Sequence, residues 1–213
     1  GVVTSIAGQY RTRVTVRGMA GHAGTVPMPL RQDALLAASE MVVMAESIAK
    51  AHPEAAMVAT VGHMKVMPGA INVIPDLVEF VLDLRASSDA PRAAALQSFT
   101  ARAEAMAAAR GCAVTFETYH DCPTAGCAPW LQDGLAGAMA ELGIDAPRLV
   151  SGAGHDGQSM EKLTDFAMLF VRCKGGISHN PLESATVEDM GLAIATLIRF
   201  IEGFRPAVRA RAT

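Results

Sequence analysis

The chain has 213 residues, of which 51% are hydrophobic and 18% are charged, and its formal net charge is -3. This composition is typical of a folded globular protein and argues against a highly charged disordered chain. Lysine and arginine residues are scattered singly, so no basic stripe indicates a nucleic acid partner. Apolar runs stay well below the roughly 20 residues that cross a bilayer, so we expect no membrane partner.

The N-terminus and the cysteines indicate a piece of a cytoplasmic protein. Residues 1–9 contain no basic region, no cleavage site and no initiating Met, which predicts a cut inside a longer chain. The cysteines are too few and too scattered for a disulfide framework in a domain of this size. We expect reduced thiols at Cys112, Cys122, Cys127 and Cys173.

The first half of the chain begins with a strand, a loop and a long helix. Residues 11–17 alternate polar and apolar side chains, which is the period of a strand with one buried face. A loop with Gly and Pro covers 18–29, and strong helix formers with apolar steps of three and four predict a helix over 30–51. Two strands at 57–66 and 71–84 flank a Pro-Gly turn and should pair antiparallel.

A second helix and a fourth strand complete this half. Ala-rich residues predict a helix over 90–110 that ends at Gly111, and residues 112–119 alternate as a strand. The resulting order βαββαβ is that of a ferredoxin-like sandwich, in which both helices cover one face of a four-stranded sheet. We therefore expect a first domain over residues 1–120.

The second half, 121–213, changes to alternating helices and strands. The predicted elements are a helix at 129–142, a strand at 148–150, a helix at 158–163, a buried strand at 166–172, a helix at 187–204 and a frayed tail at 205–213. Alternation of this kind favours a doubly wound α/β sheet, of which this segment would form only a part.

Two loops of the second half carry histidines directly after predicted strands. Ligands of open α/β sheets bind in such loops, and a neutral imidazole is the commonest protein metal ligand. His179 in GGISHNPLE and His155 in SGAGHDG are therefore candidate site residues. The alternatives are a structural or surface histidine in the first loop and, in the second, a tight turn with Asp156 near a helix N-terminus.

The first half contributes a second set of candidates. His22 lies in the loop before the long helix, Arg31 and Asp33 begin that helix, Asn72 begins a strand and Arg85 ends it. Arginine suits bidentate carboxylate recognition, asparagine can hold a ureido or amide group, and histidine can polarise a carbonyl. Together they indicate a receptor for a carboxylated amide, although each also fits an ordinary turn or surface position.

The remaining histidines lie outside any motif. They are His52, His63 and His120, and we expect structural or surface roles for them.

Four separated motifs resemble one family. They are GMAGHAGTVPMPLRQDAL from Gly18, GAINVIPDLVEFVLDLR from Gly69, SGAGHDG from Ser151 and GGISHNPLES from Gly175. The chain resembles the hydantoinase and carbamoylase branch of the binuclear-zinc aminoacylase and carboxypeptidase superfamily. That branch includes allantoate amidohydrolase, N-carbamoyl-L-amino acid hydrolase and β-ureidopropionase.

The resemblance implies a catalytic α/β zinc-hydrolase domain interrupted by a ferredoxin-like lid and dimerisation domain. By this pattern His179 is the last zinc ligand, and His22 reaches into the active site of the partner subunit of a homodimer to stabilise the oxyanion. Asn72 and Arg85 hold the ureido and carboxylate groups of the substrate, and His155 lines the pocket.

The resemblance also implies what this chain lacks. Relatives need a further His, a bridging Asp, a Glu-Glu pair and another His ahead of Gly1, and one of these glutamates is the general base. Two divalent metal ions, with zinc favoured over manganese, nickel or cobalt, would therefore bind only the complete protein. The fragment alone is expected to be inactive. Within the motifs, Gly157 replaces a common Ala and Val26 a frequent Thr.

Three functions remain open from the sequence. The first is a metal-dependent amidohydrolase that cleaves the ureido or carbamoyl C–N bond of a small carboxylate such as allantoate or an N-carbamoyl-L-amino acid. The second is an aminoacylase or dipeptidase of the same superfamily. The third is a non-catalytic dimerisation or ligand-binding module, because an antiparallel sheet leaves an edge strand that can pair with its copy.

Overall fold

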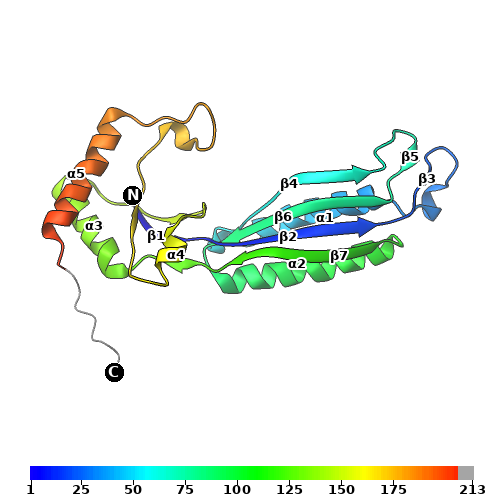
Figure 1. Ribbon diagram of the computed structural model, residues 1–213, viewed down its shortest axis with the longest axis horizontal. Coiled ribbons are helices and arrows are strands. Elements are labelled where there is room, and N and C mark those ends of the chain that lie inside the picture. Colours follow the sequence, from blue (N-terminus) through cyan, green and yellow to red (C-terminus); the bar gives the residue numbers. More distant parts are fainter. Residues whose placement is uncertain (206–213) are drawn as a thin grey trace, which may run out of the picture. The chain divides into compact units, whose positions relative to one another are not determined.

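The computed structural model describes residues 1–205, which form two compact units (Figure 1). The sandwich unit is Ala7–Thr124, and the terminal unit combines Gly1–Ile6 with the described residues from Ala125 onward. The sequence pattern predicts a domain boundary at residue 120, with the whole N-terminus in the first domain. The structure differs because β1 (Val2–Ile6) pairs with three strands of the C-terminal half.

The sandwich unit contains the predicted order of strand, helix, strand, strand, helix and strand. Its elements are β2 (Gly8–Arg17), β3 (Gly21–His22), a 3-10 helix (Met28–Leu30), α1 (Ala34–Lys50), a 3-10 helix (Pro53–Ala55), β4 (Val58–Met67), β5 (Val73–Ile74), β6 (Leu77–Ala86), α2 (Asp89–Ala109) and β7 (Ala113–Cys122). The four long strands form an antiparallel sheet in the order β4-β6-β2-β7. The predicted pairing of β4 with β6 is confirmed.

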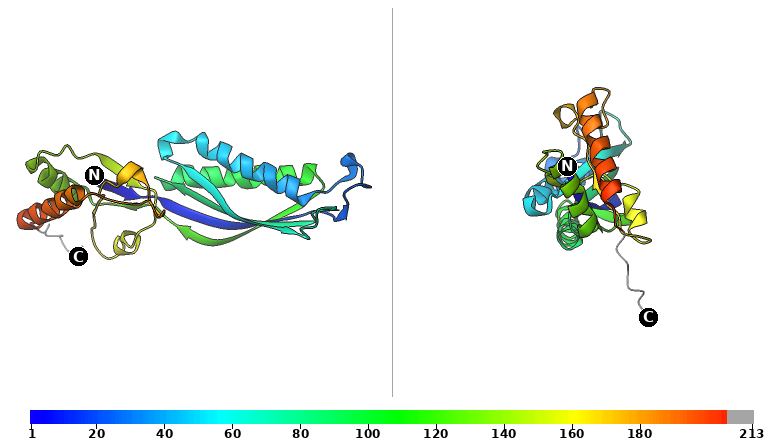
Figure 2. Two further views of the ribbon diagram at one scale, coloured as in Figure 1. Left: turned by 90° about the horizontal axis from the view of Figure 1, so that it is seen from above. Right: turned by 90° about the vertical axis from the view of Figure 1, so that its left-hand side faces the viewer.

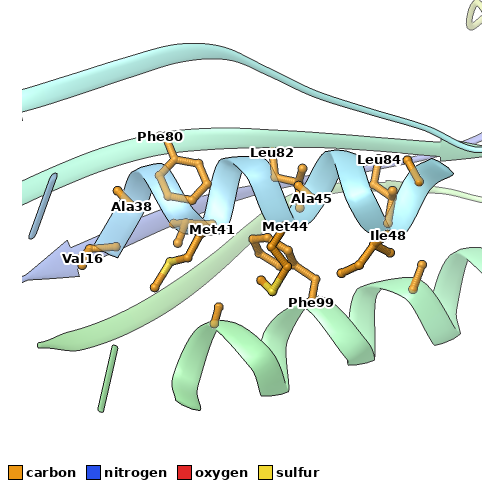
Figure 3. Close-up of a cluster of buried hydrophobic side chains, with 14 of the residues drawn as sticks. Val16, Ala38, Met41, Met44, Ala45, Ile48, Phe80, Leu82, Leu84 and Phe99 are labelled. Atoms are coloured by element: carbon orange, nitrogen blue, oxygen red, sulfur yellow. The ribbon is translucent and has the colours of Figure 1, made fainter. Parts of the chain in front are cut away.

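Both helices of this unit cover the same face of the sheet (Figure 2). Along β6 the side chains alternate, and Phe80 and Leu82 are among those buried against the helices. Met41 of α1 and Phe99 of α2 meet them in one continuous apolar core (Figure 3). Burial of this face is what fixes the strand register, because a slip of one residue would turn the core side chains to solvent.

The opposite face of the sheet is polar. Residues of β2 and β6 that alternate with the core positions include Arg11, Arg13, Glu79, Asp83 and Arg85. No helix of the sandwich unit covers this face, since both lie on the other side. It is therefore the face of this unit on which charged side chains can meet a ligand.

Local residue chemistry explains where the elements begin and end. The predicted helix over 30–51 begins only at Ala34, because the Asp33 carboxylate accepts the N–H groups of Leu35 and Leu36 and caps the first turn. The predicted strand over 71–84 is divided into β5 and β6 at Pro75, which has no N–H to donate to a sheet. Gly111 follows α2 with φ 65°, as expected for a helix C-terminus.

The terminal unit has a smaller core and a mixed sheet. Its elements are β1 (Val2–Ile6), β8 (Ala125–Gly126), α3 (Pro129–Glu141), β9 (Arg148–Ser151), α4 (Gly157–Met160), β10 (Met168–Leu169), a 3-10 helix (Lys174–Gly176) and α5 (Val187–Gly203). β1 pairs parallel with β9 and antiparallel with β8 and β10. Val2, Leu135 and Met139 are the buried residues of its apolar cluster.

Two elements of the terminal unit are shorter than predicted. The strand expected over 166–172 is only β10, because β10 pairs with Val2 and Val3 whereas β8 pairs with Ser5 and Ile6. The helix expected over 158–163 is the four-residue α4. Of the predicted tail at 205–213, all residues after Arg205 lie outside the described part.

Within residues 1–205, no helix combines the length and the apolar composition that a membrane crossing requires.

The core of the sandwich unit yields a stability prediction. Replacement of the fully buried Phe80 by Ala should lower the free energy of unfolding by about 3–5 kcal/mol, because it leaves a cavity between β6 and the helices. Val43→Ala on the exposed side of α1 is the control and should change it by less than about 0.5 kcal/mol. Urea unfolding followed by far-UV circular dichroism is the measurement, since Trp130, the one tryptophan of the chain, lies in the other unit. Equal losses in both variants would contradict the assigned core.

Candidate functional site

His22 lies where two loops of the sandwich unit meet. β3 and β5 form a two-stranded sheet in which His22 is opposite Val73. The backbone N–H of Ala23 also donates to the carbonyl of Asn72 at 2.9 Å. The structure therefore brings the backbones of His22, on β3, and Asn72, in the turn just before β5, together, and both side chains are exposed.

The loop that carries His22 is held by backbone contacts. A Cβ at Gly18 would lie 2.0 Å from the carbonyl oxygen of Gln32, so only glycine fits at the start of the loop. The Arg31 guanidinium donates from Nε to the carbonyl of Val26 at 3.0 Å and from Nη2 to that of Ala23 at 2.6 Å. These contacts restrain the backbone on both sides of the histidine.

The hydrogen bonding of His22 defines its tautomer. The backbone N–H of Gly24 donates to His22 Nδ1 at 3.0 Å. Nδ1 is therefore an acceptor without a proton, and the neutral ring carries its proton on Nε2. Because the side chain is exposed, Nε2–H is available as a donor to a developing negative charge.

Arg85 lies in a charged network on the polar face of the sheet. Its Nε and Nη2 donate to the two oxygens of Asp83 at 2.8 and 3.0 Å. Asp83 also accepts from Arg11 Nε at 2.9 Å and from Gln9 Nε2 at 3.1 Å. The sequence predicted Arg85 as a site residue, but it did not single out Asp83, Arg11 or Gln9.

The network shifts the ionisation of its members. Burial alone would raise the pKa of Asp83, but hydrogen bonds from Arg85 and Arg11 outweigh this effect and hold the pKa below its ordinary value. The hydrogen bond to Asp83 in turn raises the pKa of Arg85. Both groups therefore remain charged at neutral pH.

The two parts of the expected receptor lie at opposite ends of the sandwich unit. Arg85 is opposite Gln9 near the start of β2, whereas Arg17 at the other end of β2 is opposite Leu77. β3 and β5 lie beyond that second end (Figure 1). Since eight residues of strand span roughly 26 Å, Arg85 does not meet His22 or Asn72 within one chain. Within one chain, these three candidate residues therefore do not gather at one place.

His155 lies in the loop between β9 and α4 of the terminal unit. The N–H of Gly157 donates to His155 Nδ1 at 3.1 Å, so this ring also carries its neutral proton on Nε2. Its side chain is exposed. Asp156 lies at the N-terminus of α4, as the alternative of a tight turn expects, although its carboxylate makes no capping hydrogen bond there.

Gly157 stands where relatives commonly have alanine, and the packing around it explains the difference. A Cβ here would lie 2.7 Å from the ring of Phe166 and 2.9 Å from Ile6 Cδ1. The Phe166 ring thus fills the space that an alanine methyl group would need. The substitution fits the local packing.

His179 has a strained backbone within a short hydrogen-bonded turn. Its φ is 56°, a left-handed conformation that is uncommon for residues other than glycine and concentrates at functional sites. Its N–H donates to Glu183 Oε2 at 2.9 Å, and Ser178 Oγ lies 2.7 Å from its Nδ1. These contacts fix the ring of an exposed histidine at the position predicted for a metal ligand.

The donors for a complete metal site do not gather within the part of the chain that the structure describes. Among residues 1–205, His, Cys, Asp and Glu side chains form no group of three or more that is suited to hold an ion. His179 fits one ligand of such a site, but two ions would need donors that the described residues do not supply.

The other three histidines differ in their surroundings. His52 Nδ1 lies 3.1 Å from Glu54 Oε1, and His63 is exposed on β4. His120 Nε2 is buried on β7 with no hydrogen-bond partner among the described residues. His120 lies opposite Arg11 in the β2–β7 register, and this proximity to the charged network was not foreseen from the sequence.

Comparison with known proteins identifies the family. Residues 12–203 match the peptidase family M20/M25/M40. The chain is 38% identical to the allantoate deiminase of Arabidopsis thaliana over 95% of its own length and 43% of that protein. It is 39% identical to the N-carbamoyl-L-amino-acid amidohydrolase of Pseudomonas sp. (strain NS671), with 89% of this chain and 46% of that protein covered.

A solved structure supports the same assignment. The hydantoinase/carbamoylase family amidase of Burkholderia multivorans superposes with a TM-score of 0.88 and 34% identity, covering 93% of this chain and 48% of that one. The chain spans less than half the length of these relatives. The resemblance predicted from the four motifs is confirmed, and the chain belongs to peptidase family M20/M25/M40.

Proposed function

We propose that this chain is part of an amidohydrolase that cleaves the ureido or carbamoyl C–N bond of a small carboxylate, such as allantoate or an N-carbamoyl-L-amino acid. The names of the relatives support this reaction class. The structural observation that carries it is the hydrogen bonding of the His22 ring. Its Nδ1 accepts the backbone N–H of Gly24, so its Nε2–H is the free donor, in a loop that is hydrogen-bonded to the backbone of Asn72. A donor in this position would stabilise the oxyanion of an amide undergoing attack.

Arg85 is proposed to bind the carboxylate of the substrate. Its guanidinium is held by Asp83 and stays charged, and arginine recognises carboxylates through paired hydrogen bonds. Asn72 would bind the ureido or amide group through its side-chain donor and acceptor. His155, in the terminal unit, is proposed to line the substrate pocket of the complete enzyme.

The separation of these groups supports a site shared between two copies. Within one chain His22 and Asn72 lie at one end of the sheet and Arg85 at the other. In a homodimer, His22 of one copy would act on a substrate held by Arg85 of the other. We propose that the sandwich unit is a ferredoxin-like lid and dimerisation domain, whose edge strand β4 is available to pair with a second copy.

The complete enzyme is proposed to bind two divalent metal ions, with zinc favoured, and His179 is proposed as the ligand that this chain supplies. The exposed imidazole in a strained turn supports this role. The remaining ligands and the general base would come from outside the described residues.

We propose a cytoplasmic location. The four cysteines are all free thiols in the structure, which supports a reducing compartment.

The reaction is tested on the full-length enzyme by measuring release of ammonia and of the free amino acid. Allantoate and N-carbamoyl-L-amino acids should be hydrolysed, whereas N-acetyl-L-amino acids should react at least roughly 100-fold more slowly in kcat/KM. Faster hydrolysis of the N-acetyl compounds would replace the proposal with an aminoacylase. No hydrolysis of any of these would favour a non-catalytic module.

Arg85→Ala tests the carboxylate receptor in the full-length enzyme. The variant should raise KM for a carboxylated substrate by the equivalent of about 2–5 kcal/mol, because a desolvated charge loses its partner. Arg13→Ala is the matched control, since Arg13 lies on the same face of the sheet in an exposed ion pair with Glu117. Steady-state kinetics that are unchanged in Arg85→Ala would remove this residue from the site.

A mixing experiment tests whether the site is shared. His22→Ala and Arg85→Ala should each be nearly inactive at low substrate concentration. Mixed dimers of the two regain one intact site, formed by Arg85 of one chain and His22 of the other. Subunit exchange in a 1:1 mixture should therefore restore about one quarter of the wild-type activity, because half of the dimers are mixed and each has one of two sites. Absence of any recovery after exchange, verified by native mass spectrometry, would rule out this arrangement.

A further inference from the structure

Asp83 connects side chains from two strands of the polar face. Its carboxylate accepts four hydrogen bonds, two from Arg85 on its own strand β6 and one each from Arg11 and Gln9 on β2. The Asp83 side chain is 19% exposed, whereas those of Arg85 and Arg11 are 26% and 38% exposed. The carboxylate is thus the most enclosed charged group of the network.

The contact between Asp83 and Arg85 balances the charge of the guanidinium and also sets its orientation. Nε donates to Oδ1 at 2.8 Å and Nη2 donates to Oδ2 at 3.0 Å, so two parallel hydrogen bonds join the planar groups. Because the guanidinium is planar and rigid, a bidentate contact along one edge fixes the plane of the whole group. A long, flexible arginine side chain is thereby held in one conformation before any ligand binds.

Arg11 adds a second cation to the same carboxylate. Its Nε lies 2.9 Å from Asp83 Oδ2, the oxygen that also accepts from Arg85 Nη2. Two guanidinium groups on neighbouring strands would otherwise repel each other, and the shared carboxylate allows them to lie side by side. Gln9 donates to the same oxygen and completes its hydrogen bonding.

We propose that Asp83 is a positioning residue for substrate recognition, which fixes the guanidinium of Arg85, with Arg11 beside it, in the orientation that receives the substrate carboxylate. This inference rests on the proposed function, in which Arg85 binds that carboxylate. Asp83 acts through Arg85 and does not itself contact the substrate. Preorganisation of this kind improves affinity because the arginine loses less conformational freedom on binding.

Asp83→Asn in the full-length enzyme distinguishes positioning from a simple charge effect. The substitution removes a negative charge, so electrostatics alone would strengthen the binding of an anionic substrate and lower KM. Loss of the bidentate contact has the opposite effect, and we expect KM to rise by about ten-fold or more with kcat changed by less than about two-fold. Asp83→Glu keeps the charge but displaces the carboxylate by one methylene, and it should give an intermediate increase.

Controls separate this effect from destabilisation. Glu79→Gln removes a carboxylate from the same strand and the same face, and it should leave KM unchanged. The carboxamide analogue of the substrate lacks the carboxylate, so Asp83→Asn should leave its kcat/KM within about two-fold of wild type. Thermal melting of each variant reports any loss of folding, which would lower the amount of active enzyme without raising KM.

The outcomes distinguish this inference from the proposed function. Raised KM in both Asp83→Asn and Arg85→Ala supports it. A raised KM in Arg85→Ala with an unchanged or lowered KM in Asp83→Asn overturns the positioning role and leaves the proposed function intact. Unchanged KM in Arg85→Ala overturns both. Equal effects of Asp83→Asn on the substrate and on its carboxamide analogue also overturn the positioning role, because the defect would then not involve the carboxylate.

Discussion

The antiparallel pairing of β2 with β6 is the constraint on which the sandwich unit depends. The two strands pair residue for residue over ten positions, from Gly8 opposite Ala86 to Arg17 opposite Leu77. Alternate side chains enter the core beneath the helices, and a slip of one residue would bury the charged face instead. The same register places Arg85 and Asp83 against β2 and keeps them a strand's length from the loops that carry His22 and Asn72.

The candidate residues are held by different kinds of interaction in the two regions of this unit. His22 depends on backbone contacts, in which glycine permits a close approach at Gly18 and Arg31 hydrogen-bonds two carbonyls of its loop. Arg85 depends on a side-chain network around one carboxylate. In both regions a partly or fully exposed polar group, the His22 imidazole or the Arg85 guanidinium, is held in one orientation by hydrogen bonds within the chain. This arrangement suits a receptor in which two surfaces have to meet with defined geometry.

Much of the fold could be predicted from residue patterns, because period-two and helical alternation indicate elements with one buried face. All four long strands and both long helices of the sandwich unit lie close to their expected ranges. Two differences are local, since Asp33 delays the start of α1 and Pro75 divides the strand expected over 71–84, but the other failures are non-local. β1 joins strands more than a hundred residues away, and no local pattern at Val2 indicates this. β10 is short because β8 pairs with the rest of the same edge of β1. Two segments distant in sequence thus share one strand edge, which a local pattern cannot indicate.

The candidate site was predictable to the extent that single residues lie in motifs. His22, Asn72, Arg85, His155 and His179 were named from such motifs, but motifs say nothing about which residues meet. Asp83 was missed because an aspartate that alternates with core residues on a strand resembles any solvated position. Its spacing of two from Arg85 was the available signal, since residues i and i+2 share one face of a strand. What the spacing does not reveal is that Asp83 also binds Arg11 and Gln9, which the cross-strand register brings to it from β2.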